Sequence, residues 1–110
     1  MKEIEIIKPD DWHVHFRDGI ILKNVVPETT RHFSRAIVMP NLVPPILNGT
    51  QAIKYRDEII RNVPKKDSFK PLMTIYLTDN TDKNQLKKSY LEKKIFAAKL
   101  YPAGATTNSE

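Results

Sequence analysis

Two histidines near the start of the chain stand two residues apart, a spacing that suits a metal ion. His13 and His15 lie in the segment WHVHF, where apolar and polar residues alternate as they do along a β-strand. Side chains alternate across a strand, so both imidazoles share one face with Arg17. Two imidazoles so placed can reach one cation with ring nitrogens at about 2.0–2.1 Å. Such a pair also occurs where both histidines only bond to neighbours, so the spacing alone leaves both interpretations open.

Three further polar residues lie in or just after expected strands and could take part in chemistry. The guanidinium of Arg17 suits a carboxylate, and the amide of Asn41 offers both donors and an acceptor. Each also fits a structural role, as a surface ion pair or a loop-capping amide. Lys99 stands in the apolar run IFAAKLY, where a charged ammonium is costly to bury unless it is neutralised or paired. A lysine at a strand end can instead extend to solvent.

Strands and helices alternate along the chain and place these residues at strand ends. Apolar runs predict one strand ending near Phe16 and others over residues 35–39, 71–78 and 95–101. Helical spacing and capping signals predict helices within residues 21–33, 50–63 and 82–91. Short connections in the order β-α-β-α-β-α-β predict parallel strands with right-handed crossovers.

Local signals predict how these elements begin and pack. Thr50 and Asp82 are expected to cap the second and third helices, and Pro27 is expected near the first turn of the first helix. The apolar face of the first strand, expected to pack under the helices, holds Trp12, Val14 and Phe16. The second helix is expected to present one apolar face formed by Ala52, Tyr55, Ile59, Ile60 and Val63.

Two parallel architectures share this element order, the open doubly wound sheet and the (β/α)₈ barrel. The chain has three glycines, and no glycine-rich loop follows the first strand. Dinucleotide binding is therefore not expected. The fold class is α/β, and the order of elements leaves both architectures open.

Composition narrows the class of protein. With 40% hydrophobic and 28% charged residues, the chain is typical of a compact soluble domain, and no apolar run has the length of a membrane span or a leader peptide. We expect a cytoplasmic protein that binds no membrane. The net charge of +5 comes from lysines scattered among acids, which does not predict nucleic-acid binding. The absence of cysteine excludes a thiolate metal site.

Three motifs give the chain a resemblance to a known family. They are DDWHVHFRDG at 10–19, RAIVMPNL at 35–42 and AAKLYPAGATTNS at 97–109, with PLMTIYLTD at 71–79 between them. Together they closely resemble the monofunctional bacterial dihydroorotases of the amidohydrolase superfamily. The resemblance covers the whole chain and implies the first four strands of a (β/α)₈ barrel with two zinc ions at the carboxyl ends of the strands.

The resemblance also assigns roles to residues. It implies that His13 and His15 bind one zinc ion, and that Lys99 is carboxylated, bridges both ions and is thereby catalytic. A carbamate is anionic and offers two oxygens, whereas an ammonium cannot bind a metal. The substrate residues it implies are Arg17 and Asn41 for the substrate carboxylate, with Thr106 and Thr107 in a loop that closes over the substrate.

The activity implied is the reversible hydrolysis of the cyclic amide of L-dihydroorotate to N-carbamoyl-L-aspartate in pyrimidine biosynthesis. No residue of this chain matches the carboxylate that moves the proton in the family. Residues 1–110 are therefore expected to be the N-terminal portion of one barrel domain, active only with the C-terminal portion. The family resemblance also implies a homodimer. Two alternatives remain open: another cyclic amidase resembling hydantoinase or allantoinase, and a non-catalytic fragment that binds a partner. Arg17 with Asn41 favours an acidic substrate.

Overall fold

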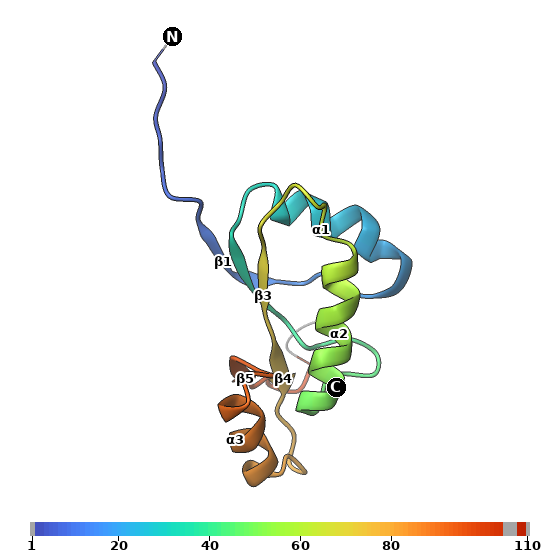
Figure 1. Cartoon of the computed structure of the whole chain (residues 1–110). Coiled ribbons are helices and arrows are strands. Elements are labelled where there is room, and N and C mark those ends of the chain that lie inside the picture. Colours follow the sequence, from blue (N-terminus) through green and yellow to red (C-terminus); the bar gives the residue numbers. More distant parts are fainter. Residues whose placement is uncertain (1, 105–107, 110) are drawn as a thin grey trace.

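Parallel strands and intervening helices form the body of the molecule (Figure 1). The computed structural model describes residues 2–104, 108 and 109. The strands are β1 (Asp10–Val14), β2 (Arg35–Val38), β3 (Lys70–Leu72), β4 (Thr74–Tyr76) and β5 (Ala97–Lys99). The helices are α1 (Leu22–Thr30), α2 (Gly49–Arg61) and α3 (Lys83–Leu91), and a short 3-10 helix, η1 (Gly19–Ile21), precedes α1. The predicted order of strands and helices is confirmed, with the third strand in two pieces and residues 2–9 outside any strand.

The order of the strands decides between the two architectures that the sequence leaves open. One sheet has the order β1-β2-β3 and the other pairs β4 with β5, and every pairing is parallel. Only Met73 separates β3 from β4, so the chain passes through four neighbouring strand positions in sequence. A doubly wound sheet reverses its strand order beside the first strand, and the described residues contain no such reversal. Consecutive parallel strands are the arrangement of the (β/α)₈ barrel.

The break at Met73 has a local cause. The hydroxyl of Thr74 donates a hydrogen bond to the backbone carbonyl of Val38 in β2, at a position where a backbone N–H would otherwise continue the ladder. Beyond this point the chain pairs with β5, and the Phe96 N–H donates to the carbonyl of Met73 at 2.7 Å. β3 therefore pairs with β2, and β4, which continues the chain after Met73, pairs with β5.

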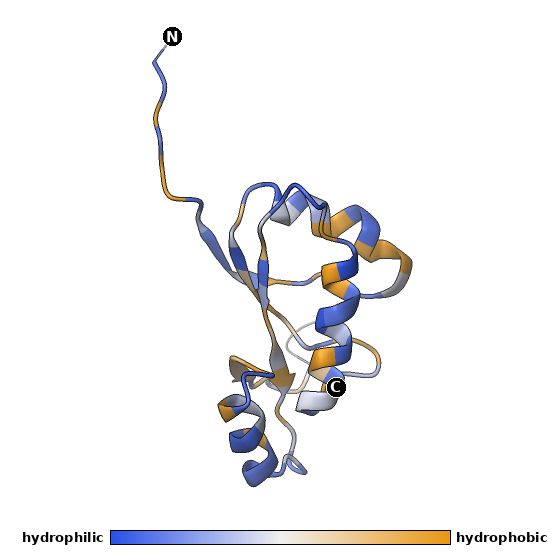
Figure 2. Ribbon diagram, in the orientation of Figure 1, coloured by the Kyte–Doolittle hydropathy of each residue, from blue (hydrophilic) through white to orange (hydrophobic). Residues whose placement is uncertain are grey.

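The hydrophobic core lies between the strands and the helices. Helices α1 and α2 and the loop after β1 supply about half of its side chains. Its members are Phe16, Leu22, Val26, Val38, Leu42, Ile46, Ala52, Tyr55, Ile59, Met73, Ile75 and Ile95. Figure 2 shows α3 as largely hydrophilic, and no residue of this helix is buried. None of the helices in the described part of the chain is long and apolar enough to cross a bilayer.

The predicted apolar face of α2 is confirmed except at one position. Ala52, Tyr55 and Ile59 are buried, and Val63 packs against the core from just beyond the helix. Ile60 was expected on this face but is 46% exposed. The reason is that adjacent helix residues point about 100° apart, so a helix that buries Ile59 turns the next side chain outward.

Two expectations for the first strand and helix are wrong. Trp12 was expected under the helices with Val14 and Phe16 but is 75% exposed, because the register of β1 against β2 shifts between Asp11 and Val14 and interrupts the alternation. Pro27 was expected near a first turn but lies further inside α1. Burial of the α1 side chains that face the core holds this helix together although proline donates no backbone hydrogen bond.

The start of α2 is capped by Asn48, whereas Thr50 was expected. The Asn48 side chain accepts a hydrogen bond from the backbone N–H of Gln51 at 2.9 Å, and Thr50 already lies inside the helix. The expected cap of α3 is confirmed, since Oδ1 of Asp82 accepts from the N–H groups of the following turn. Both caps satisfy helix donors that have no partner within the helix.

The cap assignment gives a direct test with a matched control. Asn48→Ala is expected to lower the free energy of unfolding by about 1 kcal/mol, because a helix donor loses its acceptor. Thr50→Ala is expected to change it by less than about 0.5 kcal/mol, since Thr50 is an exposed residue of the first turn. Urea unfolding of the complete protein followed by circular dichroism measures both. A larger loss for Thr50→Ala than for Asn48→Ala would contradict the assignment.

Candidate active site

The polar residues expected to act on a ligand come from the carboxyl ends of neighbouring strands. His13 lies in β1, His15 directly follows it, and Asn41 follows β2. Tyr76 ends β4, and Lys99 ends β5. Because all of these strands are parallel, their carboxyl ends meet at one edge. The candidate site is this edge of the strands.

The two histidines approach each other closely enough to share a metal ion. Their Nε2 atoms lie 3.0 Å apart, and the ring centroids are 5.0 Å apart. Two imidazole nitrogens on one tetrahedral zinc ion, at about 2.0–2.1 Å each, are separated by roughly 3.3 Å. The pair therefore fits one zinc ion, although the same distance also allows a hydrogen bond between the rings. Within residues 2–104 and 108–109, no three His, Asp or Glu side chains lie close enough together to hold a metal ion.

Backbone contacts around β1 hold the first histidine. The Oδ1 atom of Asp11 accepts a hydrogen bond from the backbone N–H of His13 at 3.0 Å, in the stretch where the register shifts. Asp10 pairs with Arg35, its neighbour across the strands. Both acids therefore make structural contacts at the start of β1.

The surroundings of His15 favour the neutral imidazole. Burial, followed by the positive charges of Arg17, His13 and Lys99, lowers the pKa of His15, while a hydrogen-bonding contribution from the Asn41 side chain acts in the opposite direction. Metals bind the neutral ring, so a lowered pKa favours the form that can act as a ligand. The same contributions indicate that Arg17, His13, Asn41 and Lys99 all lie near His15.

Arg17 is placed by an unusual backbone conformation that a buried tyrosine supports. Its φ angle is +60°, in the left-handed region that residues other than glycine seldom adopt. The hydroxyl of Tyr55 in α2 donates a hydrogen bond to the Arg17 carbonyl, and Tyr55 is only 3% exposed. Burial is the main cause that raises the pKa of Tyr55, so its hydroxyl remains protonated and can donate. Helix α2 thus fixes the loop that carries the guanidinium.

Asn41 is 1% exposed and is bonded through both its backbone and its side chain. Its backbone carbonyl accepts from Nδ2 of Asn108 at 3.2 Å. Its Oδ1 accepts from the hydroxyl of Tyr101 at 3.1 Å, and the Tyr101 ring stacks on Tyr76 with centroids 4.9 Å apart. The ring of Tyr101 also lies 5.6 Å from Nζ of Lys99, which is half-buried. Asn41 and Lys99 therefore share one neighbour.

The structure brings together most of the residues that the sequence singled out, and it adds others. His13, His15, Arg17, Asn41 and Lys99 cluster at the carboxyl edge. Sequence reasoning missed the tyrosines at positions 55, 76 and 101. A signal existed for Tyr101, which shares a strand face with Lys99 by the two-residue repeat. Thr106 and Thr107, expected to bind substrate, lie outside the described residues.

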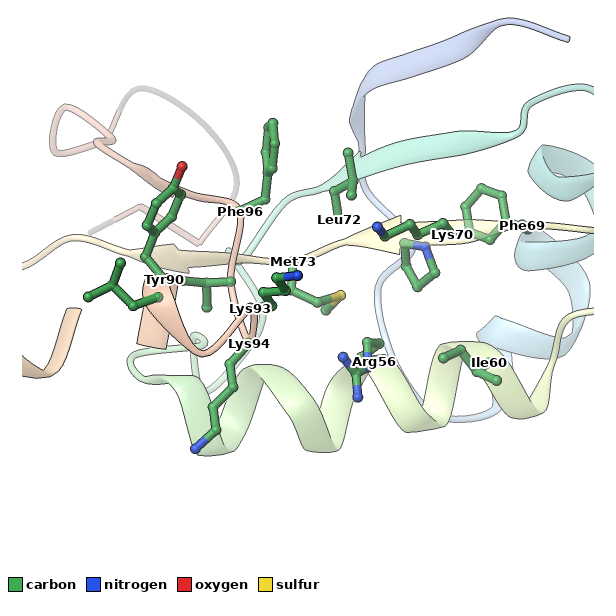
Figure 3. A pocket seen from close by; sticks show the side chains of 13 residues that line it. Arg56, Ile60, Phe69, Lys70, Leu72, Met73, Tyr90, Lys93, Lys94 and Phe96 are labelled. Carbon is green, nitrogen blue, oxygen red and sulfur yellow. The ribbon is translucent and has the colours of Figure 1, made fainter. Parts of the chain in front are cut away.

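A separate groove of about 510 Å³ opens between α2 and the end of α3, along β3 (Figure 3). Arg56 and Ile60 line it from α2, and Lys93 and Lys94 line it from the turn after α3. None of the described residues expected to bind metal or substrate lines this groove. It lies apart from the candidate site.

Comparison with known proteins identifies the relatives of the chain. No protein-family model matches. The chain is 56% identical over 108 residues to a dihydroorotase of Ruegeria pomeroyi, a match that covers 98% of this chain and 31% of that relative. It superimposes on a crystal structure of dihydroorotase from Campylobacter jejuni with a TM-score of 0.83 and 40% identity, over 92% of this chain and 29% of the other. Its relatives are dihydroorotases.

A second dihydroorotase structure, from Saccharomyces cerevisiae in complex with 5-fluoroorotic acid, matches with a TM-score of 0.83 and 35% identity. That match covers 92% of this chain and 27% of the yeast dihydroorotase. The chain spans about 31% of the length of the Ruegeria dihydroorotase. The resemblance to dihydroorotases and the predicted fold, an α/β arrangement that matches the N-terminal part of a barrel, are both confirmed.

The contact between Tyr55 and Arg17 can be tested through stability. Tyr55→Phe is expected to lower the free energy of unfolding by about 1–2 kcal/mol, because the Arg17 carbonyl loses its donor while the ring stays in the core. Tyr90→Phe is the matched control, since Tyr90 is 57% exposed on α3. Urea unfolding of the complete protein measures both variants. Equal effects would show that the Tyr55 hydroxyl does not hold the loop.

Proposed function

We propose that this chain forms the N-terminal part of the barrel of a dihydroorotase, which reversibly hydrolyses the cyclic amide of L-dihydroorotate to N-carbamoyl-L-aspartate in pyrimidine biosynthesis. The observation that carries this proposal is the approach of the His13 and His15 nitrogens to 3.0 Å, beside Arg17 and Asn41. The high identity to dihydroorotases over the whole chain supports it. Those relatives favour this activity over a hydantoinase-like amidase or a non-catalytic binding partner.

The substrate is a small acid, and two residues of this chain suit its carboxylate. Arg17 carries a planar guanidinium that can bind a carboxylate through two parallel hydrogen bonds, and Asn41 adds amide donors beside it. Together they would hold the ring in one orientation, with its amide carbonyl toward the histidines. The yeast relative was crystallised with 5-fluoroorotic acid, a cyclic compound that also carries a carboxylate. Thr106 and Thr107 are proposed to add further contacts.

His13 and His15 would hold one zinc ion of a two-zinc centre, and Lys99 would bridge both ions as a carbamate. Zinc, when bound, polarises a carbonyl and makes water a nucleophile near neutral pH. The chain's own contribution is to present two imidazoles in fixed positions and to keep His15 neutral. Carboxylation would give the half-buried Lys99 side chain an anionic end that suits a cationic centre. The group that moves a proton to the leaving nitrogen is expected outside this chain.

The domain, partner and location assignments belong to the same proposal. Residues 1–110 are proposed as one portion of a single barrel domain whose remaining portion supplies the other metal ligands. The lengths of the dihydroorotase relatives are consistent with such a second portion. A homodimer and a cytoplasmic location are further parts of the proposal.

The metal site can be tested on the complete enzyme. We expect the purified protein to contain zinc and to hydrolyse dihydroorotate, and a chelator to abolish the activity. His13→Ala is expected to weaken zinc binding by at least about 10-fold. Loss of a residue that only hydrogen-bonds to a metal ligand already weakens metal binding by about that much, and His13 is proposed as a ligand itself. Metal analysis and a hydrolysis assay measure this, beside an intact-mass spectrum that identifies every polypeptide present. His32→Ala, which alters an exposed histidine, is the control. Unchanged zinc in His13→Ala would contradict the site.

The role of Arg17 can be tested by a change that keeps the charge. Arg17→Lys is expected to raise KM for dihydroorotate by roughly 10- to 100-fold, since a lysine cannot make the two parallel hydrogen bonds. Arg35→Lys is the control, because Arg35 pairs with Asp10 at the opposite end of the strands. Steady-state kinetics of the complete enzyme measure both. A KM that moves equally in both variants would remove Arg17 from the substrate site.

A further inference from the structure

Two tyrosines stack at the carboxyl edge of the strands, and neither has a role in the function proposed above. Tyr76 ends β4, and Tyr101 lies two residues beyond the end of β5. Their ring centroids are 4.9 Å apart with an angle of 23° between the planes. The stack joins two neighbouring strands at the edge where the candidate site lies, and Nζ of Lys99 lies 5.6 Å from the Tyr101 ring. Both rings are therefore held in place.

The two hydroxyl groups of this stack differ in what they contact. The Tyr101 hydroxyl donates to Oδ1 of Asn41 at 3.1 Å. Within residues 2–104 and 108–109, no hydrogen bond of the Tyr76 hydroxyl is found. Because Asn41 is 1% exposed, water does not readily replace the Tyr101 hydroxyl as a donor. The bond therefore distinguishes one tyrosine from the other.

An asparagine amide has nearly the same shape in its two orientations but the opposite chemistry. The oxygen accepts hydrogen bonds and the nitrogen donates them, so a rotation of 180° exchanges an acceptor for two donors. A donor at Oδ1 selects one of the two orientations. With Oδ1 turned toward Tyr101, the Nδ2 group points to the other side of the amide.

We infer that Tyr101 is a positioning residue that orients the Asn41 amide so that its Nδ2 group donates to the substrate carboxylate. The inference rests on the proposed function, in which Asn41 contacts that carboxylate. With the opposite orientation, Oδ1 would face the carboxylate, and two acceptors would repel each other. Tyr76 contributes its ring to the stack, and the donor from the stack to the Asn41 amide is the Tyr101 hydroxyl.

The stacked pair supplies its own matched control. In the complete enzyme, Tyr101→Phe keeps the ring and removes the hydroxyl that bonds Asn41, whereas Tyr76→Phe removes the other hydroxyl of the same stack. Tyr101→Phe is expected to raise KM for dihydroorotate by about 3- to 10-fold, the effect of one hydrogen bond. The value of kcat is expected to change little, because binding of the carboxylate is the same before and during reaction. Tyr76→Phe is expected to raise KM by less than about twofold.

A third variant tests whether the effect passes through Asn41. In an Asn41→Ala background, adding Tyr101→Phe is expected to raise KM no further, because the amide that the hydroxyl orients is gone. Equal KM values for Tyr101→Phe and Tyr76→Phe would overturn the inference. So would a loss in Tyr101→Phe that falls on kcat with KM unchanged, or a full additional loss in the Asn41→Ala background.

A measurement that does not depend on turnover separates this inference from the proposed function. In protein labelled with ¹⁵N-asparagine, the signal that disappears in Asn41→Ala identifies the Asn41 side-chain amide. This signal is expected to shift in Tyr101→Phe and to stay in place in Tyr76→Phe. If the wild-type enzyme did not turn over dihydroorotate, the proposed function would fail, and the amide signal would still decide whether Tyr101 orients Asn41. An unshifted signal in Tyr101→Phe would overturn the orientation itself.

Discussion

Parallel pairing of consecutive strands is the constraint on which the candidate site depends. Each strand delivers its last side chains to the same edge, so residues far apart in the chain become neighbours. The positive charge of Lys99 contributes to the lowered pKa of His15, although the two residues belong to the last and first strand regions. A slip of one residue in any pairing would exchange the two faces of a strand and remove its polar side chains from the site. The geometry of the site is therefore a property of the strand register.

Helix α2 connects the stability of the fold to the geometry of the site. Its buried face contributes Ala52, Tyr55 and Ile59 to the core, and this burial fixes where the helix lies. From that position, Tyr55 bonds the carbonyl of Arg17 and supports a backbone conformation that costs free energy on its own. One side chain thus packs in the core and shapes the loop that carries the guanidinium. A loss of core packing would also disturb the site.

Local patterns were sufficient to predict the elements and the polar residues at their ends, but not the contacts between distant segments. The alternation around His13 and His15 predicted a strand with both imidazoles on one face, and their nitrogens do converge. The same alternation failed at Trp12, because an irregular register between two strands leaves no mark in one strand's sequence. The bond between Tyr101 and Asn41 joins residues 60 positions apart, and only the fold brings them together. Thr50 was expected to cap α2, but the helix begins earlier in the chain, and Asn48 caps it.

The interruption at Met73 also bears on the shape that the strands can form. A regular series of backbone hydrogen bonds between two strands resists bending. Here the Thr74 hydroxyl takes the place of a backbone N–H as the donor to the Val38 carbonyl of β2. The two halves of the third strand are free to follow different neighbours, so the direction of the sheet can change at this point. A closed cylinder needs strands that tilt and curve around an axis. The Thr74 hydroxyl thus gives the Val38 carbonyl a donor at the point where the chain leaves β2 and pairs with β5.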